Sequence, residues 1–111
     1  MADKTLVPMA VKRELRKLGS RIKQARLARN LTMQLVAERA MTTRQTVSRI
    51  EAGDPSVSFG TVLAVLNALG LLSSVDGVAD PKEDVVAQQL QRESHEKRRA
   101  RPRDPASSTR T

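Results

Sequence analysis

Cysteine and aromatic residues are almost missing from this sequence of 111 residues, which has no Cys, Trp or Tyr and one aromatic residue, Phe59. Without Cys the chain can form no disulfide, thiolate zinc site or thiol nucleophile. The single histidine, His95, has no companion for acid–base catalysis or metal binding, so we expect no metal and no cofactor. The scarcity of aromatic side chains also disfavours the stacking surfaces that bind single-stranded nucleic acids.

Long apolar segments are missing as well. No run reaches the roughly 18 apolar residues that a membrane-spanning helix requires, and we expect no membrane partner. The segment 1–18 is charged throughout and lacks the apolar stretch of a signal peptide. The length predicts a single domain with a short tail, and we expect a soluble, intracellular protein.

Basic residues, in contrast, are abundant. The 20 Lys and Arg residues exceed the 12 Asp and Glu residues, for a formal charge of +8 that favours a polyanionic partner, with duplex DNA first. The charge is uneven along the chain: +7 in residues 1–31, zero in 32–70, −3 in 71–91 and +4 in 92–111.

Apolar residues recur at helical spacing, whereas strand patterns are nearly absent, so we expect an all-α fold. The pattern predicts a helix over about 11–29 and three shorter helices that begin after Thr32, Thr43 and Ser58, which are good N-caps. Gly53 and Gly70 are predicted to end the third and fourth helices. The expected inward-facing residues are Leu15, Leu18, Ile22, Ala25, Met33, Val36, Ala37, Ala40, Val47, Ile50, Val62, Leu63, Leu66 and Leu69.

The second and third helices are joined by about three residues, so they must cross steeply, as in a helix-turn-helix. Beyond Gly70, a short fifth helix could either complete the core or mediate dimerisation through Leu71, Leu72, Val75 and Val78. Asp80, followed by Pro81 and Glu83, predicts the start of one more helix. We therefore divide the chain into an arm (1–10), a DNA-binding domain (11–79), a possible C-terminal helix (80–95) and a basic disordered tail (96–111).

The third helix has an outward face made of Arg44, Gln45, Ser48 and Arg49. When such a helix lies in a major groove, its outward residues reach base edges, where Arg pairs with guanine and Gln with adenine. These four residues are our candidates for base contact, and the less favoured alternative is a solvated polar helix face. For phosphate contact we expect helix N-termini and nearby hydroxyl or basic groups. These candidates are Lys23, Thr32, Met33, Thr42, Thr43, Thr46, Ser56 and Ser58.

Arg26 and Glu51 interrupt two apolar stripes, four residues after Ile22 and Val47 respectively. An unpaired buried charge is very costly. We therefore expect these side chains to form a structural ion pair between the first and third helices.

The segment Thr32–Gly53 (TMQLVAERAMTTRQTVSRIEAG) resembles the helix-turn-helix of the XRE, or Cro-type, family of bacterial and phage DNA-binding proteins. Residues 19–70 are similar to this family, which implies a lambda-repressor-like bundle of about five helices. The resemblance also implies base contact at Arg44, Gln45 and Arg49, and the Arg26–Glu51 pair. The family usually has glycine in the turn, where this chain has Met41, so either the turn opens or Met41 is strained.

A narrower resemblance joins Gly53–Leu72 (GDPSVSFGTVLAVLNALGLL) to the HipB-like antitoxins. It implies a cytoplasmic homodimer that represses its own operon, associates with the nucleoid when bound to operator DNA, and binds a HipA-like serine/threonine kinase toxin. A stand-alone XRE-type regulator without a toxin and, less favoured, a protein adaptor that does not bind DNA remain alternatives. The basic tail could contact DNA or a partner, or be a protease-accessible end. We expect no enzymatic activity, because no nucleophile–base pair or phosphate-cradling loop is present.

Overall fold

The computed structural model describes residues 6–100, and all regular elements in that range are helical. In chain order these are α1 (Met9–Ala28), α2 (Met33–Arg39), α3 (Arg44–Glu51), α4 (Phe59–Ala68), the 3₁₀ helix η1 (Leu72–Gly77) and α5 (Val85–Ala100). The chain divides between Ser74 and Val75 into two units, which are described separately. No helix of the described range combines the length and apolar character needed to cross a bilayer.

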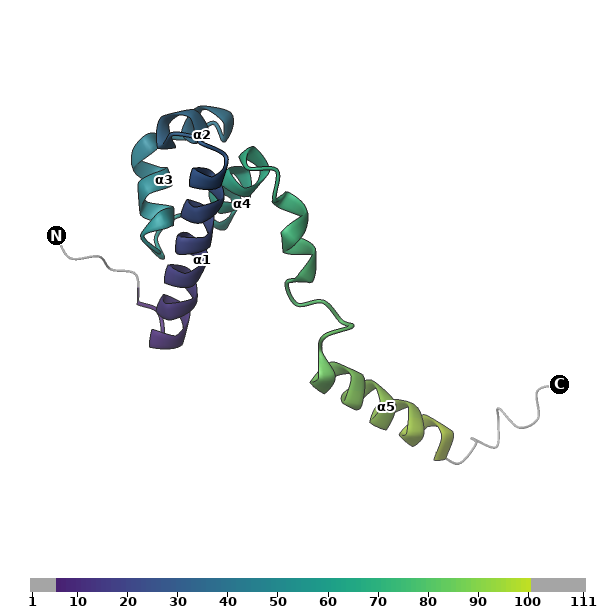
Figure 1. Cartoon of the computed structure of the whole chain (residues 1–111). Coiled ribbons are helices and arrows are strands. Elements are labelled where there is room, and N and C mark those ends of the chain that lie inside the picture. Colours follow the sequence, from purple (N-terminus) through teal and green to yellow (C-terminus); the bar gives the residue numbers. More distant parts are fainter. Residues whose placement is uncertain (1–5, 101–111) are drawn as a thin grey trace. The chain divides into compact units, whose positions relative to one another are not determined.

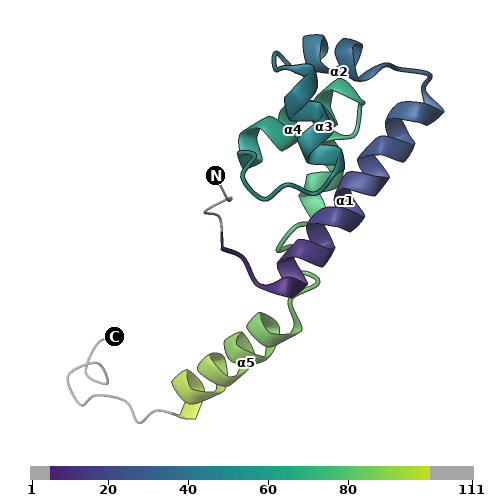
Figure 2. The same ribbon diagram turned by 90° about the vertical axis from the view of Figure 1, so that its left-hand side faces the viewer.

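The first unit contains helices α1 to α4, gathered into one bundle with α1 as its longest element (Figures 1 and 2). Helix α3 packs against both α1 and α2, and α2 also packs against α4. The core side chains are Ile22, Val36, Ala37, Ala40, Val47, Ile50, Val65, Leu66 and Leu69. Apolar residues from all four helices therefore meet in one core, as the helical periodicity predicts.

Side-chain caps set the starts of α2, α3 and α4. The hydroxyl oxygens of Thr32, Thr43 and Ser58 accept hydrogen bonds from the N–H groups three residues further on, at 3.1, 3.1 and 3.2 Å. These bonds satisfy donors that would otherwise lack a partner inside the helix. The three predicted caps are confirmed.

Two predicted features of the bundle are wrong. Helix α1 begins at Met9, inside the predicted arm, because Pro8 stands at its N-cap and the Pro8 carbonyl accepts from Val11 and Lys12. In α4 the predicted Leu66 is buried, as is Leu69 at its C-cap, but the fully buried Val65 was not predicted. Val62 and Leu63 are only half-buried, as are Leu15, Leu18, Ala25 and Met33. The α4 sequence is apolar on nearly all sides, so its periodicity does not identify the inward face.

Helices α1 to α4 all end in the same way. In each, the residue after the C-cap has a positive φ, and two backbone N–H groups turn back to carbonyls of the last turn, as in a Schellman motif. The positive-φ residues are Asn30, Met41, Gly53 and Gly70. Met41 has φ of 57° and a side chain that is 94% exposed, so the turn does not open and the residue accepts the strained conformation.

Gly19 explains how α1 and α3 approach each other so closely. A Cβ atom at this position would lie 2.5 Å from the Ile50 carbonyl oxygen and 2.6 Å from that of Glu51. Real side chains do not tolerate such distances, and the neighbouring atoms belong to rigid backbone. The residue therefore allows the end of α3 to rest directly on α1.

The second unit contains α5, and its boundaries differ from the prediction of a helix over 80–95. The Asp80 carboxylate accepts from Lys82 N at 3.0 Å and closes a turn, while Asp84 accepts from Ala87 N at 2.9 Å and caps the helix. Asp80 therefore closes a turn before the helix, and Asp84 is the residue at which α5 starts. The helix continues to Ala100, so residues 96–100 are helical and not part of a disordered tail. The rest of the predicted tail, 101–111, lies outside the described residues, as do residues 1–5 of the predicted arm.

Candidate nucleic-acid interface

Helix α3 separates an apolar inner face from a polar outer face. Val47 and Ile50 are buried against the bundle, at 0% and 5% exposure. The four candidate base readers, Arg44, Gln45, Ser48 and Arg49, are all exposed on the rest of the helix. The helix therefore offers two guanidinium groups, one amide and one hydroxyl to a partner, with no aromatic or large apolar side chain among them.

Arg26 and Glu51 lie in contact and join α1 to the end of α3. Arg26 Nε donates to Glu51 Oε2 at 2.7 Å and Nη2 donates to Oε1 at 3.1 Å, while Nη1 donates to the Leu31 carbonyl at 2.9 Å. The two side chains are only 8% and 4% exposed. The hydrogen bonds to Glu51 raise the pKa of Arg26 above its ordinary value, so Arg26 stays charged despite its burial. This contact fixes the position of α3 relative to α1.

The N-termini of α2 and α3 come together around a shared hollow. Thr32, Met33 and Arg44 line it, together with Asn30 and Gln34. Thr43 and Thr46 lie at the start of α3, where their hydroxyls share a hydrogen bond of 3.0 Å, and Thr42 precedes them in the turn. The structure therefore brings the candidate base reader Arg44 beside two of the predicted phosphate contacts.

Gln34 is a candidate that the sequence analysis missed. Its amide lies on the rim of the same hollow as Arg44, and its Nε2 donates to Glu38 on the next turn at 3.3 Å. The sequence gives no sign of this role beyond the position of Gln34 in the first turn of α2, two residues after the cap Thr32.

The loop from α3 to α4 holds the other hydroxyl candidates in local bonds. Ser56 donates to the Asp54 carboxylate through its backbone N–H at 2.8 Å and its hydroxyl at 2.7 Å. These bonds, with a smaller effect of the Arg49 guanidinium, lower the pKa of Asp54 below its usual value. Ser58 caps α4 and shares a hydrogen bond with the Thr61 hydroxyl at 2.7 Å. Within residues 6–100, no hydrogen bond or ion pair joins Lys23, exposed on α1, to the other candidates.

Comparison with known families identifies this region. The helix-turn-helix family model matches residues 22–75, which span part of α1, all of α2 to α4 and the start of η1. A search of curated proteins found no match, and a search of solved structures found none.

The first unit therefore contains an XRE-type helix-turn-helix, in which α2 and α3 are the two helices of the motif. The match and the helical architecture confirm the predicted all-α, lambda-repressor-like bundle. The match is to a DNA-binding regulatory domain, and it supports a DNA-binding regulator of the XRE type.

Proposed function

We propose that this protein is a sequence-specific transcriptional repressor that reads duplex DNA through Arg44, Gln45, Ser48 and Arg49 of α3. The observation that carries the proposal is the division of α3 into a buried face and an outer face that is polar and exposed. A helix that is held on one side by Val47, Ile50 and the Arg26–Glu51 pair can dock in a major groove as a rigid body.

The phosphate contacts of this proposal surround α3. Helix N-termini carry N–H groups without intrahelical partners and a partial positive charge, which attract phosphates. Thr32 and Met33 at α2, and Thr42, Thr43 and Thr46 at α3, would contact one part of the backbone, with Gln34 beside them. Ser56 and Ser58 would contact another part, and Lys23 would add charge from α1. Capping does not compete with this role, because each cap occupies only one N–H group.

A direct test selects binding sites from random duplexes and compares the protein with two variants, Arg44→Ala and Gln45→Ala. Each bidentate contact discriminates between bases by about 1–3 kcal/mol, so each variant should lose roughly 5- to 150-fold in preference at one base position. Arg13→Ala is the matched control, because Arg13 is exposed on α1 and is not a candidate contact. Unchanged base preference in both α3 variants would contradict the proposed reading.

The proposal includes a symmetric homodimer that binds two half-sites about one helical turn apart or a multiple of it. In the first unit Leu72 is 43% exposed and Leu71 is half-buried, so apolar surface remains available at its end. In the second unit Val78 is 65% exposed and Val75 is half-buried. Analytical ultracentrifugation of the unmodified protein should show a dimer. The Leu72→Ser dimer should be weaker, so it should dissociate into monomers already at a higher protein concentration.

We extend the proposal to the role of an antitoxin that represses its own operon and binds a HipA-like kinase. The support is the resemblance of Gly53–Leu72, which in the structure forms the loop before α4, α4 itself and the turn after it. The test is to identify the neighbouring gene and to ask whether its product co-purifies with this chain. A HipA-like kinase that co-purifies would support the antitoxin role. A neighbouring gene for a protein other than a HipA-like kinase would favour the stand-alone regulator.

A further inference from the structure

Helix α5 is a second helix with exposed arginine and glutamine side chains, and the proposed function does not use it. All residues of α5 are exposed except Ala87, which is half-exposed. Within residues 6–100, no Asp or Glu carboxylate lies within ion-pair distance of Arg92, Arg98 or Arg99. These guanidinium groups are available to a partner.

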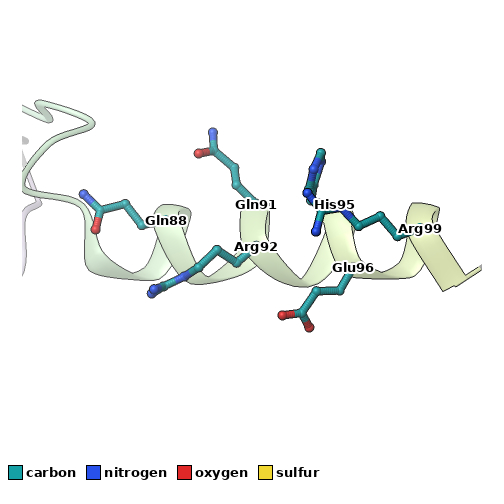
Figure 3. A pocket seen from close by; sticks show the side chains of 6 residues that line it. All are labelled: Gln88, Gln91, Arg92, His95, Glu96 and Arg99. Carbon is teal, nitrogen blue, oxygen red and sulfur yellow. The ribbon is translucent and has the colours of Figure 1, made fainter.

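The arginines of α5 gather on one side of the helix axis, whereas Lys97 lies on the opposite side with Glu93. At about 100° per residue, a single side of roughly 120° holds every arginine and the histidine of the helix. We call this side the basic face; its members are Gln88, Gln91, Arg92, His95, Arg98 and Arg99, and Glu96 lines the same hollow at its edge. Glu93 and Glu96 lie outside this arc, with Glu96 at its rim. Figure 3 shows Gln91 and His95 pointing to one side of the helix and Glu96 to the other.

Helix stability alone does not explain this separation. Basic residues near a helix C-terminus interact favourably with the helix dipole, which accounts for the position of Lys97, Arg98 and Arg99 along the axis. The dipole has no preference around the axis, so it does not account for the exclusion of both glutamates from the basic face. It also does not account for Arg92, which lies in the middle of the helix.

From the proposed DNA binding of the first unit, on which this inference rests, we propose that the basic face of α5 binds phosphates of the same duplex. Arginine forms paired hydrogen bonds with phosphate oxygens, and duplex DNA carries about one negative charge per 1.7 Å of its axis. Arg92, Arg98 and Arg99 spread over about 10 Å of helix length, which matches several phosphates. Because α5 is tethered to the helix-turn-helix unit, its binding adds affinity without adding base specificity.

The experiment measures the affinity of the full chain for duplex DNA of mixed sequence as a function of KCl concentration. Each lost phosphate contact reduces the slope of log K against log salt by about 0.9. The triple variant Arg92→Gln, Arg98→Gln, Arg99→Gln should therefore show a slope that is less steep by about two to three. Lys97→Gln, on the other side of the helix, should change the slope far less than Arg99→Gln.

A charge-swapped variant separates the geometry of the face from net charge. Arg92→Glu with Glu93→Arg, combined with Glu96→Arg and Arg99→Glu, preserves the composition and the charge of +8 but disrupts the basic face. We expect a less steep slope and weaker binding, with α5 still helical by circular dichroism. Binding as strong as that of the unmodified protein would overturn the inference.

The same measurements separate this inference from the proposed function. If the swapped variant binds normally while Arg44→Ala loses base preference, the basic face is not a DNA contact and the reading by α3 stands. If the unmodified protein shows no salt-dependent duplex binding, the proposed function fails, and this inference fails with it. Loss of affinity in the α5 variants with unchanged base preference supports both.

Discussion

Helices α3 and α5 both expose arginine and glutamine, but only α3 is held in a fixed position. Two core side chains, the Arg26–Glu51 pair and the close contact at Gly19 hold α3 in place. Helix α5 has no buried residue, and its order comes from its own caps and side-chain bonds, such as Gln89 to Glu93.

This difference determines what each helix can do with the same side chains. Discrimination between bases requires a donor placed within hydrogen-bond reach of one base edge, which demands a rigid support. Attraction to phosphates requires only charge on the correct side of a helix. We therefore expect substitutions that loosen the support of α3 to affect folding and base preference. Substitutions in α5 should change the affinity for DNA and its salt dependence, but not the base preference.

The largest effect is expected from Arg26→Ala. Removing one member of a buried ion pair leaves the other charge unpaired, which costs about 3–5 kcal/mol, a large share of the stability of a small domain. Urea denaturation should show a much lower midpoint. Arg29→Ala is the matched control, because Arg29 is three residues further on and exposed, and its guanidinium donates to the Ala25 carbonyl of its own helix. Its loss should change stability by less than about 0.5 kcal/mol. Equal midpoints for the two variants would mean that the pair does not support α3.

Gly19→Ala is expected to have the next largest effect. The added methyl group would collide with the Ile50 and Glu51 carbonyls and separate α1 from α3, at a cost of about 1–3 kcal/mol. Gly60→Ala offers the opposite case within α4, because a Cβ there meets no atom within 4 Å. That control should be stabilised by about 0.5–1 kcal/mol, since alanine loses less entropy in a helix. If both changes stabilise the protein in thermal unfolding, the close contact at Gly19 is not required.

Two kinds of feature could be predicted from the sequence: helix caps, which depend on neighbouring residues, and the Arg26–Glu51 ion pair, which joins two helices. The caps Thr32, Thr43 and Ser58 act on N–H groups three residues away, so the local sequence is sufficient to identify them. Glu51 and Arg26 were predicted as partners because each is a charge on an apolar stripe, where it would be buried without a partner at a high cost in free energy.

Apart from the Arg26–Glu51 pair, features that depend on contacts between residues far apart in the sequence could not be predicted. Gly19 is required because the end of α3 rests on it, and its own helix gives no sign of this contact. In α4 the apolar sequence allowed several inward faces, and packing against α2 selected Val65. Gln34 became a candidate only when α2 and α3 placed it beside Arg44.

Met41→Gly should increase the stability of the protein, in contrast to the two changes above, because it relieves strain in the turn that leads into α3. The left-handed conformation raises the free energy of a residue with a side chain by about 1–2 kcal/mol, and glycine avoids this cost. Part of the gain is lost, because glycine has more conformational entropy in the unfolded chain. Because Met41 is 94% exposed, little packing is lost, and we expect a gain of about 0.5–1 kcal/mol. Gly70→Ala, at φ of 76° and in open space, should show a loss of similar size. A lower melting temperature for Met41→Gly would indicate that its side chain contributes to stability.

The smallest effect is expected at Asp54, which follows α3 and bonds to Ser56. The pKa of this carboxyl is lowered below its usual 3.8 in the folded protein, so its ionised form stabilises the fold. That contribution is complete above the unfolded pKa and disappears as the pH falls through the lowered, folded value. Asp54→Asn keeps the acceptor oxygen but removes the charge, so the variant should melt slightly below the unmodified protein at about pH 7. The difference in melting temperature should vanish in acid, once the pH is below both the unfolded and the folded pKa, because both proteins are then uncharged at this position. A difference that persists in acid would show that it comes from changed hydrogen bonding or packing and not from the charge.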